Sequence, residues 1–113
     1  MHELAVTRSI LDIALSHAQK ASAKRITSIN LVIGKLASVV DESVQFYWDI
    51  LSNGTIAKGA KLNFTRIPAE MRCFDCGNVF NPGDSTFACP VCQSVRVQVT
   101  KGDELRIDSI DVE

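Results

Sequence analysis

Four cysteines constrain this chain more than any other feature of its sequence. They form two Cys-x-x-Cys pairs, Cys73 with Cys76 and Cys89 with Cys92, and twelve residues separate the pairs. Each short spacing brings two sulfurs to one side of a tight turn. Two such turns facing each other offer four thiolates in a tetrahedron, the arrangement that Zn²⁺ takes in closed structural sites. The sequence therefore predicts a structural zinc site.

Two other interpretations of the cysteines remain open. In an oxidising compartment the same residues would form two disulfides or stay as free structural thiols, whereas a reducing cytosol favours a metal. Iron also fits four thiolates, as in a rubredoxin-like electron carrier. With either metal, four protein ligands leave no open coordination position, so we expect no catalysis at this site.

The composition predicts a folded protein that binds neither nucleic acid nor membrane. Of the 113 residues 46% are hydrophobic, and the formal net charge is −1. A phosphate-dominated nucleic-acid binder would carry a basic excess. No apolar stretch approaches the roughly 20 residues that span a bilayer, and the first residues lack the basic region of a signal peptide. We therefore expect a cytoplasmic protein.

Hydrophobic periodicity predicts two helices and several strands. Apolar residues at steps of three and four predict a helix over residues 4–22, and a second helix over 42–51 that Asp41 would cap. Alternating apolar residues predict strands over 26–33, 61–67 and 104–112. One side of the second helix is apolar and is expected to face the core, with Val44, Tyr47, Trp48 and Leu51 on it.

The last predicted strand decides the expected domain organisation. It is too apolar to end as a free tail, and the cysteine segment is too small to use it, so we expect it to pair with the earlier strands. The fold class is then α+β, with two helices on a small three-stranded sheet and an inserted zinc-ribbon-like module. The main domain would be discontinuous, comprising residues 1–69 plus 102–113, and the zinc-binding module would comprise residues 70–101.

The first three residues, Met1, His2 and Glu3, support a second metal hypothesis. The Met1 amine, the His2 amide and the His2 imidazole can chelate one ion in fused small rings, and Glu3 can add an amide nitrogen or its carboxylate. Four nitrogens in a plane suit Ni(II) or Cu(II) and not Zn²⁺. Against this stands the general expectation that chain ends carry little information.

The remaining polar residues receive structural interpretations. His17 lies on the apolar stripe of the first helix, so we expect it to pack against neighbours. Asp41 and Glu42 are expected to cap the second helix instead of supporting a nickel site. No Gly-rich phosphate loop, Ser/His/Asp set or pair of catalytic carboxylates is visible, so we expect no catalytic residue and no enzyme activity.

Several stretches together resemble the HypA/HybF family over essentially the whole chain. They are "MHEL", "INLVIGKLASV" leading into "DESVQFYWDIL", "GAKL", the double Cys-x-x-Cys and the closing "GDELRIDSIDVE". Members of that family are nickel-insertion accessory proteins in the maturation of NiFe-hydrogenase. The resemblance implies a Ni²⁺ cargo held by the Met1 amine, the His2 imidazole and the backbone amides near Glu3, and a structural Zn²⁺ held by the four cysteines.

The resemblance also implies partners. They are a HypB-type GTPase and the hydrogenase large subunit, and some members of the family serve urease. Some members place histidines in or near the zinc module, whereas this module has none. A monomer or a weak, domain-swapped dimer is expected, because an inserted module on short hinges can exchange between copies.

Three classes of function follow from the sequence. The favoured one is a nickel metallochaperone that binds Ni(II) at its N-terminus and delivers it for hydrogenase maturation. The second is a zinc-ribbon module that binds protein or nucleic acid, and the near-neutral charge counts against nucleic acid. The third is a rubredoxin-like electron carrier.

Overall fold

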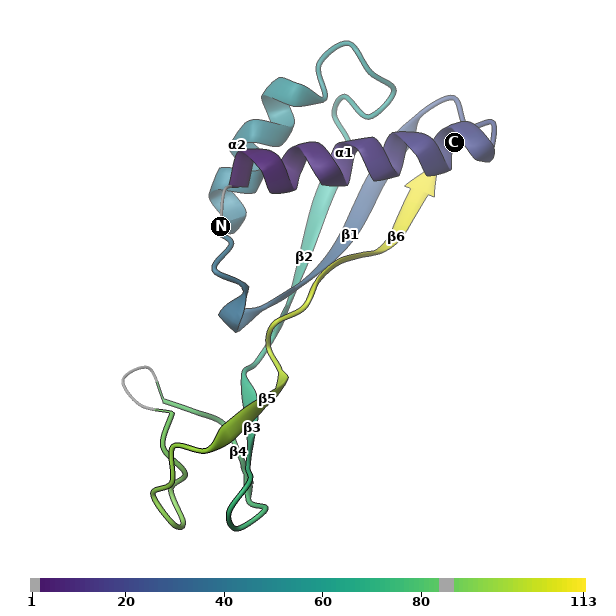
Figure 1. Ribbon diagram of the computed structural model, residues 1–113. Coiled ribbons are helices and arrows are strands. Elements are labelled where there is room, and N and C mark those ends of the chain that lie inside the picture. The colour runs from purple at the N-terminus through teal and green to yellow at the C-terminus, as the bar shows by residue number, and fades with distance from the viewer. Residues whose placement is uncertain (1–2, 84–86) are drawn as a thin grey trace. The chain divides into compact units, whose positions relative to one another are not determined.

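The computed structural model describes residues 3–83 and 87–113 and contains two helices and six strands in that part of the chain (Figure 1). The elements follow one another as α1 (Glu3–Lys20), β1 (Ile26–Gly34), the 3-10 turn η1 (Lys35–Ala37), α2 (Asp41–Leu51), β2 (Lys61–Ile67), β3 (Glu70–Cys73), β4 (Val79–Phe80), β5 (Val97–Lys101) and β6 (Leu105–Val112). The expected α+β class is therefore confirmed.

The chain divides into two compact units. The helix–sheet unit contains the described residues up to Val32 together with Ser38–Thr65 and Arg106–Glu113. The cysteine unit contains Ile33–Ala37 and Arg66–Leu105. Two three-stranded sheets are present among the described residues, with strand orders β2-β1-β6 and β4-β3-β5. The last strand, β6, thus pairs with β1, the first strand of the chain.

The helices bury part of the apolar stripes that their periodicity predicts, whereas Tyr47 and Leu51 of α2 are half-buried and Ile13 of α1 is exposed. In α1 the buried side chains are Thr7, Ile10, Leu11, Ala14 and Ala18, and in α2 they are Val44 and Trp48. These spacings of three and four residues place one stripe of each helix against the interior. The two helices pack against each other (Figure 1).

The end of α1 has a local cause. Ser22 adopts a left-handed backbone conformation with φ of 54°. The N–H of Ala23 then donates to the Ala18 carbonyl at 2.9 Å, and the N–H of Ser22 donates to the Gln19 carbonyl at 3.0 Å. These bonds satisfy carbonyl groups that the last turn of a helix leaves without a partner.

Two expectations about single residues are wrong. The helix α2 begins at Asp41, and its N-cap position is Val40, whose extended backbone has φ of −97° and ψ of 121°. Asp41 instead lies in the first turn, where a carboxylate still suits the positive end of the helix dipole. His17 is exposed, because the buried stripe of α1 passes through Ala14 and Ala18 and leaves His17 beside it.

The cysteine unit is built on a short antiparallel sheet with few buried side chains. Its central strand β3 pairs Met71 with Phe80 of β4 and with Val99 of β5, and Cys73 pairs with Val97. Met71 is 5% exposed, whereas Val95, two residues before β5 begins, is 81% exposed.

Two glycines allow a close backbone approach inside the cysteine unit. A Cβ on Gly34 would lie 2.0 Å from the carbonyl oxygen of Gly102, and Gly102 has a φ of 109° that disfavours other residues. The N–H of Leu36 donates to that same carbonyl oxygen at 2.7 Å. Glycine is therefore required where the end of β1 meets the segment between β5 and β6.

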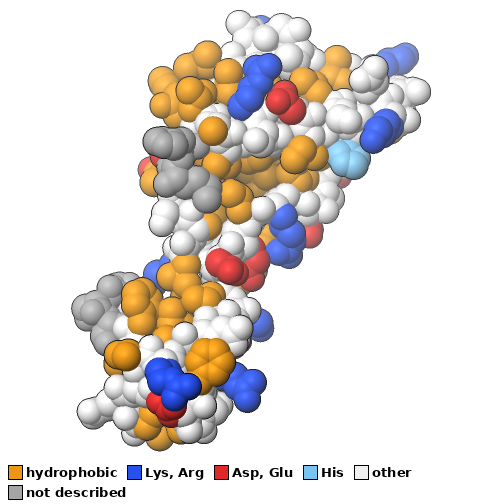
Figure 2. Space-filling model, viewed as in Figure 1, with side chains coloured by type: hydrophobic (Ala, Val, Ile, Leu, Met, Phe, Trp, Pro, Cys, Tyr) orange, Lys and Arg blue, Asp and Glu red, His pale blue; other side chains and the backbone are white. Residues whose placement is uncertain are grey.

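Some large apolar side chains remain at the surface (Figure 2). Phe46 and Ile50 of α2 are 60% and 58% exposed, and Phe74 in the cysteine unit is 61% exposed.

Within the described residues, none of the helices combines the length and the apolar character that crossing a bilayer needs.

Candidate metal centre

The two Cys-x-x-Cys segments fold into turns with the same hydrogen-bond pattern. In the first knuckle, residues 73–78, the N–H of Cys73 donates to the Asn78 carbonyl and the N–H of Gly77 donates to the Cys73 carbonyl, both at 2.9 Å. In the second knuckle, residues 89–94, the N–H of Cys89 donates to the Ser94 carbonyl at 2.9 Å. The N–H of Gln93 completes the pattern by donating to the Cys89 carbonyl at 2.8 Å.

Each knuckle needs one residue with a left-handed backbone at the same position. That residue is Gly77 in the first knuckle, with φ of 76°, and Gln93 in the second, with φ of 61°. Glycine adopts this conformation at little cost, whereas glutamine has a Cβ that clashes with its own backbone. The second knuckle therefore carries local strain that the first knuckle avoids.

The knuckles bring all four sulfurs together. The four Sγ atoms lie within 4.8 Å of one another. The Sγ atoms of Cys73 and Cys92 are 3.5 Å apart, and those of Cys76 and Cys89 are 3.6 Å apart. Four sulfurs bound at about 2.3 Å to one tetrahedral ion would lie about 3.8 Å apart, whereas a disulfide needs about 2.05 Å. The four cysteines form no disulfide, so the disulfide interpretation is wrong, and the closeness of their sulfurs fits the ligands of one ion such as zinc.

The thiols of Cys73 and Cys89 have lowered pKa values. Cys73 and Cys89 are buried. The backbone N–H of Cys92 is the main cause that lowers the pKa of the Cys89 thiol to about 6. The backbone N–H of Cys76 likewise lowers the pKa of the Cys73 thiol. Both effects arise because a hydrogen-bond donor stabilises the thiolate.

The thiols of Cys76 and Cys92 have raised pKa values. Cys76 and Cys92 are exposed. The backbone N–H of Ser94 stabilises the Cys92 thiolate, but the sulfur of Cys73, partial desolvation and the other two sulfurs raise the pKa of Cys92 to about 12. Desolvation and the sulfur of Cys89 outweigh the Asn78 N–H and raise the pKa of Cys76. Four thiolates at neutral pH therefore need a bound cation, which is what a metal site supplies.

Three polar residues beside the cluster, Asp75, Ser94 and Arg96, do not stand out in the sequence. Asp75 lies between the first two cysteines, and Ser94 and Arg96 lie within a few residues after the last cysteine. Their position next to the ligands was the available signal, but their mutual contacts join segments about twenty residues apart and have no periodic pattern. The Asn78 side chain also reaches the cluster, with its Nδ2 atom 3.9 Å from the Cys89 sulfur.

The predicted N-terminal site falls largely beyond the described part of the chain. Met1 and His2 lie outside the described residues, and Glu3 is the first residue of α1. The Glu3 carbonyl accepts a hydrogen bond from the Thr7 hydroxyl at 2.6 Å, and Thr7 is fully buried. Over residues 3–83 and 87–113, the cysteines are the one group of three or more His, Cys, Asp or Glu side chains placed to share an ion.

A cluster of four cysteine sulfurs that could hold one ion, in a small α+β protein, is typical of metal-binding proteins. Comparison with known proteins narrows this class: the chain belongs to the HypA family, whose model is described as hydrogenase/urease nickel incorporation, metallochaperone, and matches residues 1–112. The family expected from the sequence is therefore confirmed.

Similar proteins cover the whole chain. The hydrogenase maturation factor HypA of Dehalococcoides mccartyi strain 195 is 48% identical over 113 residues, which are 100% of this chain and 95% of that protein. The hydrogenase maturation factor HybF of Escherichia coli O6:H1 is 36% identical, and both chains are covered completely. The solution structure of the Ni metallochaperone HypA from Helicobacter pylori has a TM-score of 0.70 at 27% identity, covering 99% of this chain and 97% of its own.

Proposed function

We propose that this protein is a nickel metallochaperone that binds Ni(II) at its N-terminus and delivers it for the maturation of NiFe-hydrogenase. The observation that carries the proposal is the match of the family model, which covers residues 1–112. The relatives named hydrogenase maturation factors, and the solved relative titled a Ni metallochaperone, support the same role. The protein would act by binding and release, without a reaction of its own.

The proposed nickel ligands are the Met1 amine, the His2 imidazole and the backbone amides near Glu3. The start of α1 at Glu3 supports this choice, because the first N–H groups of a helix make no intrahelical hydrogen bond. Using these amide nitrogens as ligands therefore breaks no bond of the helix. The buried Thr7 hydroxyl holds the Glu3 carbonyl and ties the proposed site to a packed element.

The proposed role of the cysteine cluster is a structural Zn²⁺ held by Cys73, Cys76, Cys89 and Cys92. Because four thiolates bind the metal only when deprotonated, metal binding and folding of the cysteine segment are one equilibrium. We further propose that residues 70–101 form the zinc-binding module and that residues 1–69 plus 102–113 form the nickel-binding domain. Zinc would leave the protein colourless, whereas iron in a rubredoxin-like site would make it red.

The proposed partners are a HypB-type GTPase and the hydrogenase large subunit. The sequence carries no Gly-rich phosphate loop, so GTP hydrolysis would belong to the partner. We expect the protein to act in the cytoplasm, as a monomer or a weak, domain-swapped dimer.

A Ni(II) titration of two full-length proteins tests the nickel site. The first is the native chain, and the second carries one alanine ahead of Met1, which moves the amine and shifts the chelate rings while every side chain stays. Intact mass spectrometry first verifies that Met1 is the N-terminal residue of the native sample. We expect nickel binding to collapse in the extended protein and in His2→Ala. The matched control is His17→Ala, which removes the exposed histidine of α1 and should bind nickel normally. Equal binding by the native and extended proteins would refute an N-terminal site.

A further inference from the structure

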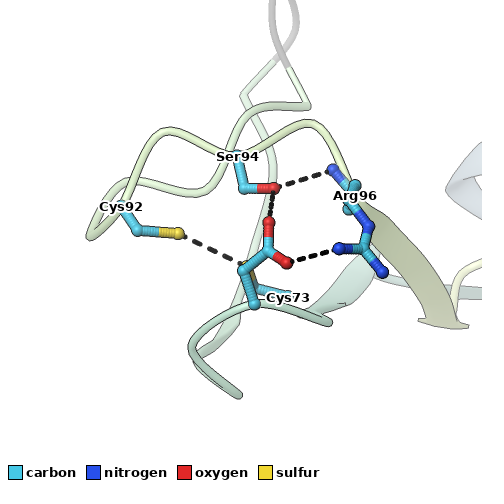
Figure 3. Close-up of polar contacts among 5 residues, drawn as sticks. Cys73, Cys92, Ser94 and Arg96 are labelled. Carbon is cyan, nitrogen blue, oxygen red and sulfur yellow. Dashed lines mark hydrogen bonds and ion pairs between the residues drawn. The ribbon is translucent and has the colours of Figure 1, made fainter.

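A network of three side chains joins the two knuckles at one edge of the cysteine cluster (Figure 3). Asp75 belongs to the first knuckle, Ser94 ends the second, and Arg96 follows two residues later. One carboxylate oxygen of Asp75 accepts from Arg96 Nη1 at 2.9 Å, and the other accepts from the Ser94 hydroxyl. The Ser94 oxygen in turn accepts from the backbone N–H of Arg96 at 3.0 Å. We call these three residues the Asp75 clamp.

The same residues reach the sulfurs through their backbone. The N–H of Asp75 acts as a hydrogen-bond donor to the Cys73 thiol, and the N–H of Ser94 acts as a donor to the Cys92 thiol. Cys73 and Cys92 are the two ligands whose sulfurs lie 3.5 Å apart. The side-chain bond between Asp75 and Ser94 therefore joins two residues whose amides donate to these sulfurs, although the Cys76 amide has the larger effect on Cys73.

A backbone contact reinforces the clamp. The N–H of Phe74, in the first knuckle, donates to the carbonyl oxygen of Arg96 at 2.9 Å. At the opposite edge, where Cys76 faces Cys89, Asn78 Nδ2 lies 3.9 Å from the Cys89 sulfur, within the longer range of hydrogen bonds to sulfur. The Cys73–Cys92 edge is bridged by three hydrogen bonds to oxygen, from Ser94 and Arg96 to Asp75 and from Phe74 to Arg96.

We propose that Asp75, Ser94 and Arg96 are positioning residues for the four-thiolate site, which hold the two knuckles together and slow the release of the bound metal. The proposal rests on the zinc assignment above. To lose its metal, the site must let one knuckle move away from the other while a competing ligand replaces a thiolate. The two bonds that Asp75 accepts, from Ser94 and from Arg96, join the first knuckle to the segment of the second, so they resist this separation even though they touch the metal at no point.

The exposure of the clamp decides how large its effect can be. The side chains of Arg96 and Asp75 are 72% and 39% exposed. An exposed ion pair by itself adds little to the stability of a folded protein. Residues that orient metal ligands have larger effects on the metal, typically 10- to 100-fold in affinity. We therefore expect the clamp to act on metal release and to weaken as salt screens the Asp75–Arg96 pair.

The experiment measures the rate at which zinc passes from the full-length protein to a chromophoric chelator. The variants are Asp75→Asn, Ser94→Ala and Arg96→Gln, with Arg96→Lys as the variant that keeps the charge. We expect Asp75→Asn to release zinc about tenfold faster, at the lower end of the range for residues that orient ligands. Arg96→Lys should restore part of the slow release that Arg96→Gln loses. The double variant of Asp75→Asn and Ser94→Ala should release zinc little faster than either single variant, because both remove the same connection.

Asp12→Asn is the matched control. It removes the carboxylate of the exposed Arg8–Asp12 pair, whose N–O distance is 3.5 Å, from α1 in the helix–sheet unit. We expect it to release zinc at the native rate. The spectrum of the Co(II)-substituted protein should be the same in native and Asp75→Asn samples, because the four ligands are unchanged.

Release of zinc at the native rate by both Asp75→Asn and Ser94→Ala would overturn the proposal for the clamp. A release by Asp12→Asn as fast as that by Asp75→Asn would also overturn it. A native protein that holds no zinc would instead overturn the zinc assignment, so the two failures can be told apart.

Discussion

The two units of this protein differ in what fills their interiors. The helix–sheet unit buries large apolar side chains, among them Trp48, Leu11, Ile29 and Leu31, each at most 1% exposed. The cysteine unit buries Ile33 and Met71 together with Cys73, Cys89 and some small residues, while five of its other large apolar side chains are at least half exposed, namely Phe74, Val79, Phe87, Val91 and Val95. Apolar burial can hold the first unit, whereas the second has too little of it and depends on its cysteine cluster.

Metal removal should give the largest difference in stability between the two units. Cys73→Ser, or a chelator acting on the native protein, should unfold the cysteine unit and leave the helix–sheet unit folded. Structural zinc in small modules contributes on the order of 10 kcal/mol of apparent binding free energy at neutral pH, so the loss exceeds what the small apolar core can replace. Amide NMR spectra, resolved for each unit, measure the outcome. Simultaneous collapse of both units would show that the contrast between them is wrong.

A substitution in the apolar core should destabilise the helix–sheet unit and leave the cysteine unit and its zinc unchanged. Trp48→Ala should destabilise the helix–sheet unit by about 3–5 kcal/mol, the usual cost of truncating a buried aromatic side chain, while the zinc content stays constant. Denaturant unfolding with parallel zinc analysis measures both quantities. Trp48→Phe is the matched control and should cost less, because the Trp48 indole N–H is buried without a hydrogen-bond partner among the described residues, so its loss breaks no bond. Loss of zinc in Trp48→Ala would contradict the prediction.

The pH dependence of metal binding tests the uneven ionisation of the sulfurs. At pH 7 Cys89, with a pKa of about 6, is mostly a thiolate, whereas Cys92, with a pKa of about 12, is a thiol, and the pKa of Cys76 is also raised. Zinc binding at pH 7 should therefore release about two protons or more. Each proton released changes the binding free energy by about 1.4 kcal/mol per pH unit.

The direction in which pH changes the zinc affinity follows from the released protons. Because binding displaces protons, the affinity for zinc rises with pH and falls on acidification, more steeply once Cys89 also takes up its proton below about pH 6. Calorimetry in buffers of different ionisation enthalpy counts the protons. A count near zero would mean that the four sulfurs already ionise together in the metal-free protein.

The smallest expected effect is a difference in stability between substitutions at matching positions of the two knuckles. Gln93→Gly should stabilise the zinc-loaded protein by up to about 1 kcal/mol, because glycine relieves the left-handed backbone at this position. Gly77→Gln should destabilise it by about 1–2 kcal/mol through the same strain, since a Cβ on Gly77 has open space around it. Thermal unfolding of both zinc-loaded variants measures the difference. Shifts of the same sign in both variants would show that φ is not the cause.

Features that depend on residues close together in the chain followed from the sequence. The two Cys-x-x-Cys pairs determined a four-thiolate cluster, because their spacing builds each turn locally. The steps of three and four residues in α1 determined its buried stripe, through Ile10, Ala14 and Ala18. The family was also determined by these same stretches together with the first residues of the chain.

Features that depend on distant residues needed the tertiary structure. The sequence predicted that the last strand pairs with the earlier strands, and the tertiary structure decided that its neighbour is β1, where the Thr27 hydroxyl donates to the Asp111 carbonyl across 84 positions of sequence. It decided that His17 lies on the exposed side of the buried stripe and that Val40, instead of Asp41, occupies the N-cap position of α2. It also brought Asp75 to Ser94 and Arg96. Local spacing specifies a turn or a helical face, but which segments meet depends on how the whole chain buries its apolar surface and pairs its strands.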